Sequence, residues 1–218
     1  MTQNFIQNIT STLIATSLLW GCAPKAKHSS NSAMADAKAQ IPSKSHADWK
    51  LVPEESGMTY ITLKNRDLAE INTFREIEGT VTPAGHAEII IDLNSVDTNN
   101  EVRDDRLKSL LFQTDSYPKA KISSVIDMVK LEQLAIGESQ TLLLDMNISL
   151  HSASLQRDFY VLATRLEKDK VVVTNKAPLI LHAQDFGFMS AIEELRNLAS
   201  LDEITPIVTA TVSFVFER

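Results

Sequence analysis

The sequence contains little cysteine, little glycine and fewer basic than acidic residues. Its one cysteine, Cys22, permits neither an intramolecular disulfide nor a cluster of cysteine ligands for a metal. Six glycines in 218 residues exclude a collagen-like repeat. With 28 acidic against 21 basic side chains, the formal net charge of −7 argues against nucleic acid as a partner, because phosphate binding requires a basic face.

The motifs that mark common enzymes are also missing. The sequence has no GxSxG nucleophile elbow, no GxGxxG and no P-loop. Its histidines have no HExxH spacing and no neighbouring cysteine. We therefore predict a protein without catalytic residues, without a metal site and without a resident cofactor.

The first 21 residues contain no lysine or arginine, but they include a short apolar run. Residues 12–20 are too few to span a bilayer, which takes about 20 residues, and they fit the core of a signal peptide, which takes about 7–15. Leu19, Gly21 and Cys22 resemble the lipobox of bacterial lipoproteins. We expect residues 1–21 to be a lipoprotein signal peptide and Cys22 to be lipidated. The alternative is an unstructured N-terminus with a free thiol.

The segment after Cys22 lacks aromatic side chains. Residues 23–47 are rich in Ala, Ser and Lys and bury too little apolar surface to offset chain entropy. We predict that residues 22–47 comprise the lipidated cysteine and a flexible tether, and that residues 48–218 form the folded domain. If lipoprotein sorting applies, Ala23 indicates the outer membrane. We therefore expect a bacterial cell-envelope protein that faces the periplasm.

Alternation of apolar and polar residues dominates the sequence after Trp49. It is clearest in residues 88–94, 142–150 and 208–216, as in strands with one buried and one wet face. Weaker strand candidates are residues 58–64, 76–82, 120–128, 157–168, 170–175 and 178–182, with turns at 83–85, 167–170 and 175–176. This pattern indicates an up-and-down barrel or a sandwich.

Two stretches carry leucines at helical spacing. We expect short amphipathic helices over residues 102–112 and 190–201, either as a lid or as a plain cover for an open end. The first includes the charged run Arg103-Asp104-Asp105-Arg106. This run fits either a polar collar that orients a ligand head group or a turn and helix cap tied to a neighbouring arginine.

Several residues together resemble the YceI-like, polyisoprenoid-binding family. Its central motif is matched by Ser95-Val96-Asp97-Thr98, Arg103-Asp104, Leu107, Leu111-Phe112 and Tyr117-Pro118. Supporting matches are Trp49, Phe74, Gly79, Leu150-His151, Asp185-Phe186-Gly187 and Ile204-Thr205. The resemblance covers nearly all of residues 49–218. It implies an all-β fold with short helical insertions: an eight-stranded antiparallel lipocalin-like β-barrel whose apolar lumen holds an isoprenoid chain.

The apolar faces of the expected strands supply the residues that would line such a lumen. Binding would be driven by removing hydrocarbon from water, at about 0.8 kcal/mol per CH₂. The lumen candidates are Ile89, Ile91, Leu93, Leu142, Leu144, Met146, Ile148, Phe159, Val161, Val212, Phe214 and Phe216. The candidates for the mouth are Phe112, Phe186, Phe188 and Met189. Plain core packing is an equally open interpretation for each mouth candidate.

The sequence thus predicts a non-enzymatic protein that binds, stores or transports an isoprenoid, quinone-like or fatty-chain lipid in the bacterial envelope. The alternative is a structural or assembly lipoprotein with a packed barrel that acts through a protein partner. An envelope hydrolase or isomerase is a third possibility. The identity of the ligand, the openness of the lumen and the oligomeric state are left open.

Overall fold

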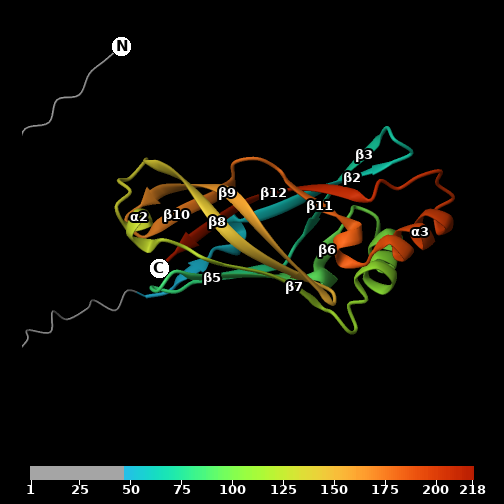
Figure 1. Cartoon of the computed structure of the whole chain (residues 1–218), viewed down its shortest axis with the longest axis horizontal. Helices are drawn as coiled ribbons and strands as arrows, with labels where there is room; N and C mark the ends of the chain where they lie inside the picture. The colour runs from blue at the N-terminus through green and yellow to red at the C-terminus, as the bar shows by residue number, and fades with distance from the viewer. Residues whose placement is uncertain (1–46) are drawn as a thin grey trace, which may run out of the picture. The chain divides into compact units, whose positions relative to one another are not determined.

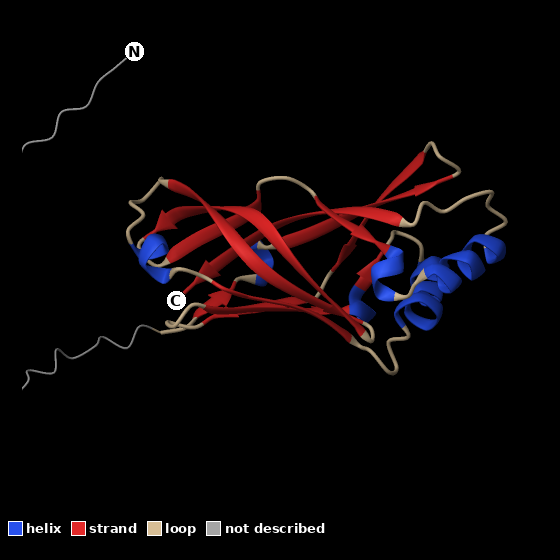
Figure 2. Cartoon of the chain, viewed as in Figure 1, coloured by secondary structure: helices blue, strands red, loops and turns tan. Residues whose placement is uncertain are grey.

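The computed structural model describes residues 47–218. The predicted signal peptide, Cys22 and the predicted tether up to residue 46 lie outside the described residues, so these stay predictions. The described part consists mostly of antiparallel strands. Figure 2 shows most of its helical residues gathered at one end of those strands.

Twelve strands form one sheet. They are β1 Trp49–Leu51, β2 Gly57–Lys64, β3 Leu68–Phe74, β4 Ile77–Val81, β5 His86–Asp92, β6 Val96–Asp97, β7 Lys119–Val125, β8 Ser139–Leu150, β9 Ala153–Glu167, β10 Lys170–Asn175, β11 Leu179–His182 and β12 Ile207–Glu217. The helices are α1 Glu101–Arg106, a π-helix Leu107–Phe112, α2 Met128–Glu132 and α3 Met189–Leu198. Short 3₁₀ helices lie at Pro53–Glu55, Leu93–Ser95 and Ala183–Phe186.

Eight of the strands close into a barrel. The order around the ring is β1-β4-β5-β7-β8-β9-β10-β12, and β1 pairs with β12 to complete it. Beyond the ring, β12 pairs with β2, β2 with β3 and β3 with β6, which extends the wall toward α1 and α3 (Figure 1). The predicted all-β class and eight-stranded antiparallel barrel are confirmed.

Two of the three predicted turns join hairpins. Residues 83–85 connect β4 to β5, and Lys168 and Asp169 connect β9 to β10. Gly85 has φ +89°, and a Cβ there would lie 2.1 Å from the carbonyl oxygen of Ile126. Only glycine fits this turn, because it needs both the left-handed backbone and the missing side chain.

The turn predicted at residues 175–176 is wrong. Both β10 and β11 run antiparallel to β12, so the chain continues in one direction across Asn175 and does not reverse. The Asn175 side chain accepts from the Val212 amide at 2.9 Å and donates to the Ala210 carbonyl at 3.3 Å. A side-chain amide therefore takes the place of backbone groups in the β12 ladder at this irregularity.

The strand ends also differ from the prediction in two places. Residues 93 and 94 lie in a 3₁₀ turn, where the Asp92 side chain accepts from the Asn94 amide at 2.8 Å. Strand β7 ends at Val125, and Asp127 then caps α2 by accepting from the Val129 amide at 3.1 Å. In both places an aspartate side chain bonds to nearby backbone and ends the strand.

One end of the barrel is closed around Trp49. This indole is 1% exposed, with the guanidinium carbon of Arg218 at 4.4 Å and that of Arg165 at 5.5 Å from its ring centroid. Arg165 donates to the carbonyls of Leu131 and Lys168, each at 2.7 Å. These bonds tie α2 and the β9–β10 turn across that end, which lies away from α3 in Figure 1.

Candidate functional site

Two adjoining cavities occupy the interior of the barrel. The larger, of about 500 Å³, lies beneath α1, the π-helix and α3, and the smaller, of about 120 Å³, extends toward Trp49. Met58, Ile122, Leu179 and Ala210 line both cavities. We call the two together the lumen. Volumes of about 300–1,000 Å³ are usual for sites that enclose a small molecule.

Every predicted lumen residue lines one of the two cavities. Around the smaller cavity lie Ile89, Leu142, Leu144, Met146, Phe159, Val161, Val212, Phe214 and Phe216. Around the larger lie Ile91, Leu93 and Ile148. The alternation of strands β5, β8, β9 and β12 explains this placement, because every second side chain points inward. Which of these residues contact a lipid stays a prediction.

An arc of aromatic rings crosses the larger cavity. Phe112 of the π-helix lies 5.8 Å from Phe74 and 6.2 Å from Phe188, measured between ring centroids. Phe186 follows at 6.2 Å from Phe188, and Tyr60 stacks on Phe74 at 5.5 Å. These distances fall in the favourable range for aromatic pairs. This arc joins the barrel wall to α1, the π-helix and α3, which together we call the helical cover.

Three of the four predicted mouth residues, Phe112, Phe186 and Phe188, line the larger cavity. Met189 does not line either cavity and is 48% exposed. It begins α3 with its side chain toward solvent, whereas Ile192 and Leu195 of the same helix line the cavity. A contact between Met189 and a ligand has no support in this geometry.

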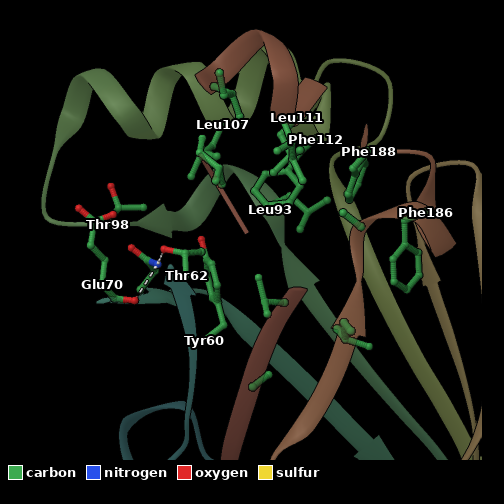
Figure 3. Close-up of a pocket in the computed structure, with 18 of the residues that line it drawn as sticks. Tyr60, Thr62, Glu70, Leu93, Thr98, Leu107, Leu111, Phe112, Phe186 and Phe188 are labelled. Atoms are coloured by element: carbon green, nitrogen blue, oxygen red, sulfur yellow. Dashed lines mark hydrogen bonds between the residues drawn. The ribbon is translucent and has the colours of Figure 1, made fainter. Parts of the chain in front are cut away.

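The helical cover contains a π-helix. Residues 107–112 form six consecutive π-helical positions after α1, and Leu107, Leu111 and Phe112 all line the larger cavity. Figure 3 shows Leu107, Leu111 and Phe112 grouped above Leu93, with Phe188 and Phe186 beside them. The wider turn of a π-helix changes the angular spacing of side chains, and such segments are frequent at functional sites.

The end of the larger cavity formed by β2 and β3 is polar. Thr62, Lys64, Glu70 and Asn72 line it, together with Tyr60. The Glu70 carboxylate pairs with Lys64 Nζ at 2.5 Å and with the Arg103 guanidinium. Burial by itself raises the pKa of Glu70, but hydrogen bonds from Lys64 and Arg103 outweigh it and hold this pKa below its usual value.

Two buried oxygens at this polar end have no hydrogen-bond partner within residues 47–218: Tyr60 Oη and Asn72 Oδ1. Tyr60 is 8% exposed and Asn72 is 3% exposed. Burial, and then the charge of Asp104, raises the pKa of Tyr60, while Arg103 lowers it to a smaller extent. An unsatisfied buried polar group costs about 1–3 kcal/mol, so both oxygens mark a place where a partner is expected.

The charged run at residues 103–106 forms the predicted helix cap and turn, and its two arginines also line the larger cavity. Asn100 caps α1 by accepting from the Arg103 amide at 3.0 Å, and Asp104 Oδ1 accepts from the Thr98 amide at 2.9 Å. These contacts are the cap and turn of the simpler interpretation. Arg103 and Arg106, however, also line the larger cavity. The run therefore shapes the helix and contributes charge to the polar end.

Comparison with known proteins identifies the family. The model of the YceI-like domain matches residues 49–216. This chain belongs to the YceI-like family. No curated protein matches the chain.

Two solved structures show what this YceI-like domain is similar to. A polyisoprenoid binding domain from Saccharophagus degradans, implicated in plant cell wall breakdown, is 31% identical with a TM-score of 0.76, over 78% of this chain and 97% of that one. Burkholderia cenocepacia BcnA is 13% identical with a TM-score of 0.58, over 76% of this chain and 98% of that one. The second likeness concerns the fold alone.

In the described part of this YceI-like chain, no three His, Cys, Asp or Glu side chains gather in a way that could hold a metal ion. No helix between residues 47 and 218 is both long and apolar enough to cross a membrane.

The polar end was missed because β3 inverts the pattern that reveals a strand. Its inward positions hold Glu70 and Asn72, whereas Ile71 points outward and is 66% exposed. One signal was nevertheless present in the sequence. Polar residues alternate at 62 and 64 and again at 70 and 72, on either side of Asn65 and Arg66, whose φ values of 48° and 72° fit a tight hairpin turn.

Proposed function

We propose that this YceI-like domain binds one slender apolar molecule in its lumen and performs no chemistry on it. The observation that carries the proposal is the pair of adjoining cavities, lined by inward-facing apolar side chains of the closed sheet. A hydrocarbon chain placed there loses its contact with water, which stabilises the complex by about 0.8 kcal/mol per CH₂.

The chemical class of the ligand is proposed from shape and similarity. An eight-stranded barrel leaves an interior just wide enough for one small or slender ligand. The 31% identity to a polyisoprenoid binding domain supports an isoprenoid, and quinone-like and fatty chains share its shape. We propose storage or transport of such a lipid as the physiological role.

The cellular setting is proposed from residues outside the described part. The apolar run at 12–20 and Gly21-Cys22 support a lipoprotein anchored through Cys22 in the bacterial envelope and facing the periplasm. Ala23, the residue after the cysteine, supports attachment to the outer membrane. The alternative of an assembly lipoprotein required a packed barrel. An interior with about 500 Å³ of free volume gives that alternative no support.

Native mass spectrometry of the purified full chain tests the proposal. We expect a copurified lipid, or uptake of one added isoprenoid alcohol per chain. Ala210 lines both cavities, so Ala210→Leu narrows their junction and should weaken uptake about tenfold. Its neighbour Thr211 is exposed, and Thr211→Leu is the matched control that should bind normally. Absence of any lipid, copurified or added, would contradict the proposal.

A further inference from the structure

Two cross-strand neighbours at the polar end of the lumen, Tyr60 and Asn72, each carry an unpaired side-chain oxygen. Asn72 is the direct cross-strand partner of Tyr60 in the β2–β3 ladder, so both side chains project from the same face of the sheet. Both residues line the larger cavity, and neither Asn72 Oδ1 nor Tyr60 Oη bonds to another group of the described chain. In Figure 3, Tyr60, Thr62 and Glu70 stand together across the cavity from Phe188.

The two oxygens differ in the bonds they can make. Asn72 Nδ2 donates to Thr62 Oγ1 at 3.1 Å and to the Glu70 carbonyl at 3.4 Å. Because a carbonyl only accepts, the amide nitrogen must lie on that side and Oδ1 is left as an acceptor. The Tyr60 hydroxyl can both donate and accept. A group that donates one hydrogen bond and accepts another therefore complements the pair.

We propose that the molecule held in the lumen ends in an uncharged hydroxyl or primary amide, which donates to Asn72 Oδ1 and accepts from Tyr60 Oη. This rests on the proposed function, since a head group is selected only if a chain occupies the lumen. Hydrocarbons, ethers and simple carbonyls cannot donate, and they leave Asn72 Oδ1 unpaired. The site thus distinguishes alcohols and amides from other lipids with the same chain.

An anionic head group does not fit this end of the lumen. Lys64 and Arg103, the cations beside Asn72 and Tyr60, both bind the Glu70 carboxylate. At the Tyr60 hydroxyl, the negative charge of Asp104 has more effect on the pKa than the positive charge of Arg103. A second negative charge placed beside Asn72 and Tyr60 would lose its hydration, and the charges of Lys64 and Arg103 are already shared with Glu70.

Arg106 offers the competing interpretation. It lines the same cavity, and its side chain makes no hydrogen bond or ion pair within residues 47–218. A phosphate or carboxylate on the ligand could pair with this guanidinium. Binding of that kind would depend on Arg106 and not on Asn72, so substitutions at the two positions separate the hypotheses.

The test compares three ligands that share one chain: geranylgeraniol, its methyl ether and geranylgeranyl phosphate. Binding to the delipidated full chain is measured by displacement of a fluorescent apolar probe. We expect the alcohol to bind about tenfold more tightly than the ether, the gain expected of one recovered hydrogen bond, and the phosphate to bind most weakly. Asn72→Leu should abolish the preference for alcohol over ether, because it removes the acceptor oxygen that only the alcohol can use.

Further variants keep the test decisive. Tyr60→Phe keeps the ring and should reduce the preference even if Asn72→Leu does not fold. Asn147→Leu makes the same change at an exposed position of β8 and should keep the full preference. Equal binding of alcohol and ether would overturn the inference while the proposed function stands. Tightest binding of the phosphate, lost in Arg106→Gln, would also overturn it. If no chain binds at all, both proposals fail.

Discussion

Glycine positions show how single residues fix the barrel turns. Gly85 and Gly137 both have left-handed backbones, with φ of +89° and +84°. A Cβ at Gly85 would overlap the Ile126 carbonyl, whereas a Cβ at Gly137 would have nothing within 4 Å. Comparing the same substitution at Gly85 and Gly137 therefore separates the cost of backbone strain from the cost of steric overlap.

We expect Gly85→Ala to destabilise the domain more than Gly137→Ala. The latter should cost about 1 kcal/mol for the left-handed backbone alone, and the former about 2–3 kcal/mol because the β4–β5 turn must also move. Urea unfolding of both variants measures the difference. Equal losses would show that the turn accommodates a methyl group at residue 85 without strain.

Ionisation of Glu70 makes the stability of the fold depend on pH. Its pKa is lower in the folded chain than in the unfolded one, so its ion pairs stabilise the fold above the unfolded pKa of about 4.3. That contribution is lost as pH falls through the folded pKa. We expect the free energy of unfolding of wild type to exceed that of Glu70→Gln by about 1 kcal/mol at pH 7. This difference should close below about pH 4.

Thermal unfolding of both proteins between pH 7 and pH 3 measures this gap. The exposed Glu78, which makes no ion pair in the described chain, supplies the control variant Glu78→Gln, whose difference from wild type should not change with pH. A gap for Glu70→Gln that stays constant down to pH 3 would contradict the assignment of Lys64 and Arg103 as partners that stabilise the charged form.

At the scale of elements, the barrel wall is split between β9 and β11. Strand β9 pairs with β10 only from Val161 onward, and β11 pairs with β12 alone. Within residues 47–218, the first half of β9 therefore faces β11 without a hydrogen-bonded ladder. The Arg157 side chain crosses the split and donates to the Ile180 carbonyl at 2.6 Å.

We expect Arg157→Met to loosen β11. Removing the donor leaves β11 held on one side only, and loss of a bond from a charged group costs about 1.5–3 kcal/mol. Hydrogen exchange of peptides covering residues 177–184 should become faster by about tenfold or more, because local opening becomes easier. Arg66 lies in the distant β2–β3 turn and forms an exposed ion pair with Glu203. Arg66→Met removes this pair and should leave hydrogen exchange in β11 unchanged. Unchanged exchange in both variants would mean that β12 alone holds β11.

The sequence predicted those elements whose apolar side chains point inward. Residues 88–94, 142–150 and 208–216 alternate regularly, and strands β5, β8 and β12 follow them closely. The alternation does not reveal strand β3, because the inner face of this strand is polar. It does not reveal the break at Asn175 either, because a side-chain amide that replaces backbone hydrogen bonds leaves no periodic signal. Alternation along the strands was enough to predict the apolar lumen. Predicting the polar end would have required knowing which side chains of β2, β3 and α1 lie next to one another.

At the scale of the whole chain, the domain begins at the closed end of the barrel. Trp49 opens β1 and packs against Arg218, while the larger cavity lies under α1 and α3 at the other end. In the proposed lipoprotein, the tether from Cys22 would thus join the domain at the end away from the helical cover.

Lipidation of Cys22 is the step on which this arrangement depends. Expressed in a bacterial host, the full chain should sediment with membranes and lose residues 1–21, because the diacylglyceryl and N-acyl chains together exceed the two anchors needed for stable attachment. Cys22→Ser removes the thiol that accepts the lipid and should leave the protein in the soluble extract. Ser43→Ala, a similarly small change in the predicted tether, should leave the protein with the membranes. Intact mass measurement distinguishes the forms. A wild-type chain whose Cys22 reacts with maleimide and whose mass carries no lipid would rule out the anchor, and the free thiol would then be the correct interpretation.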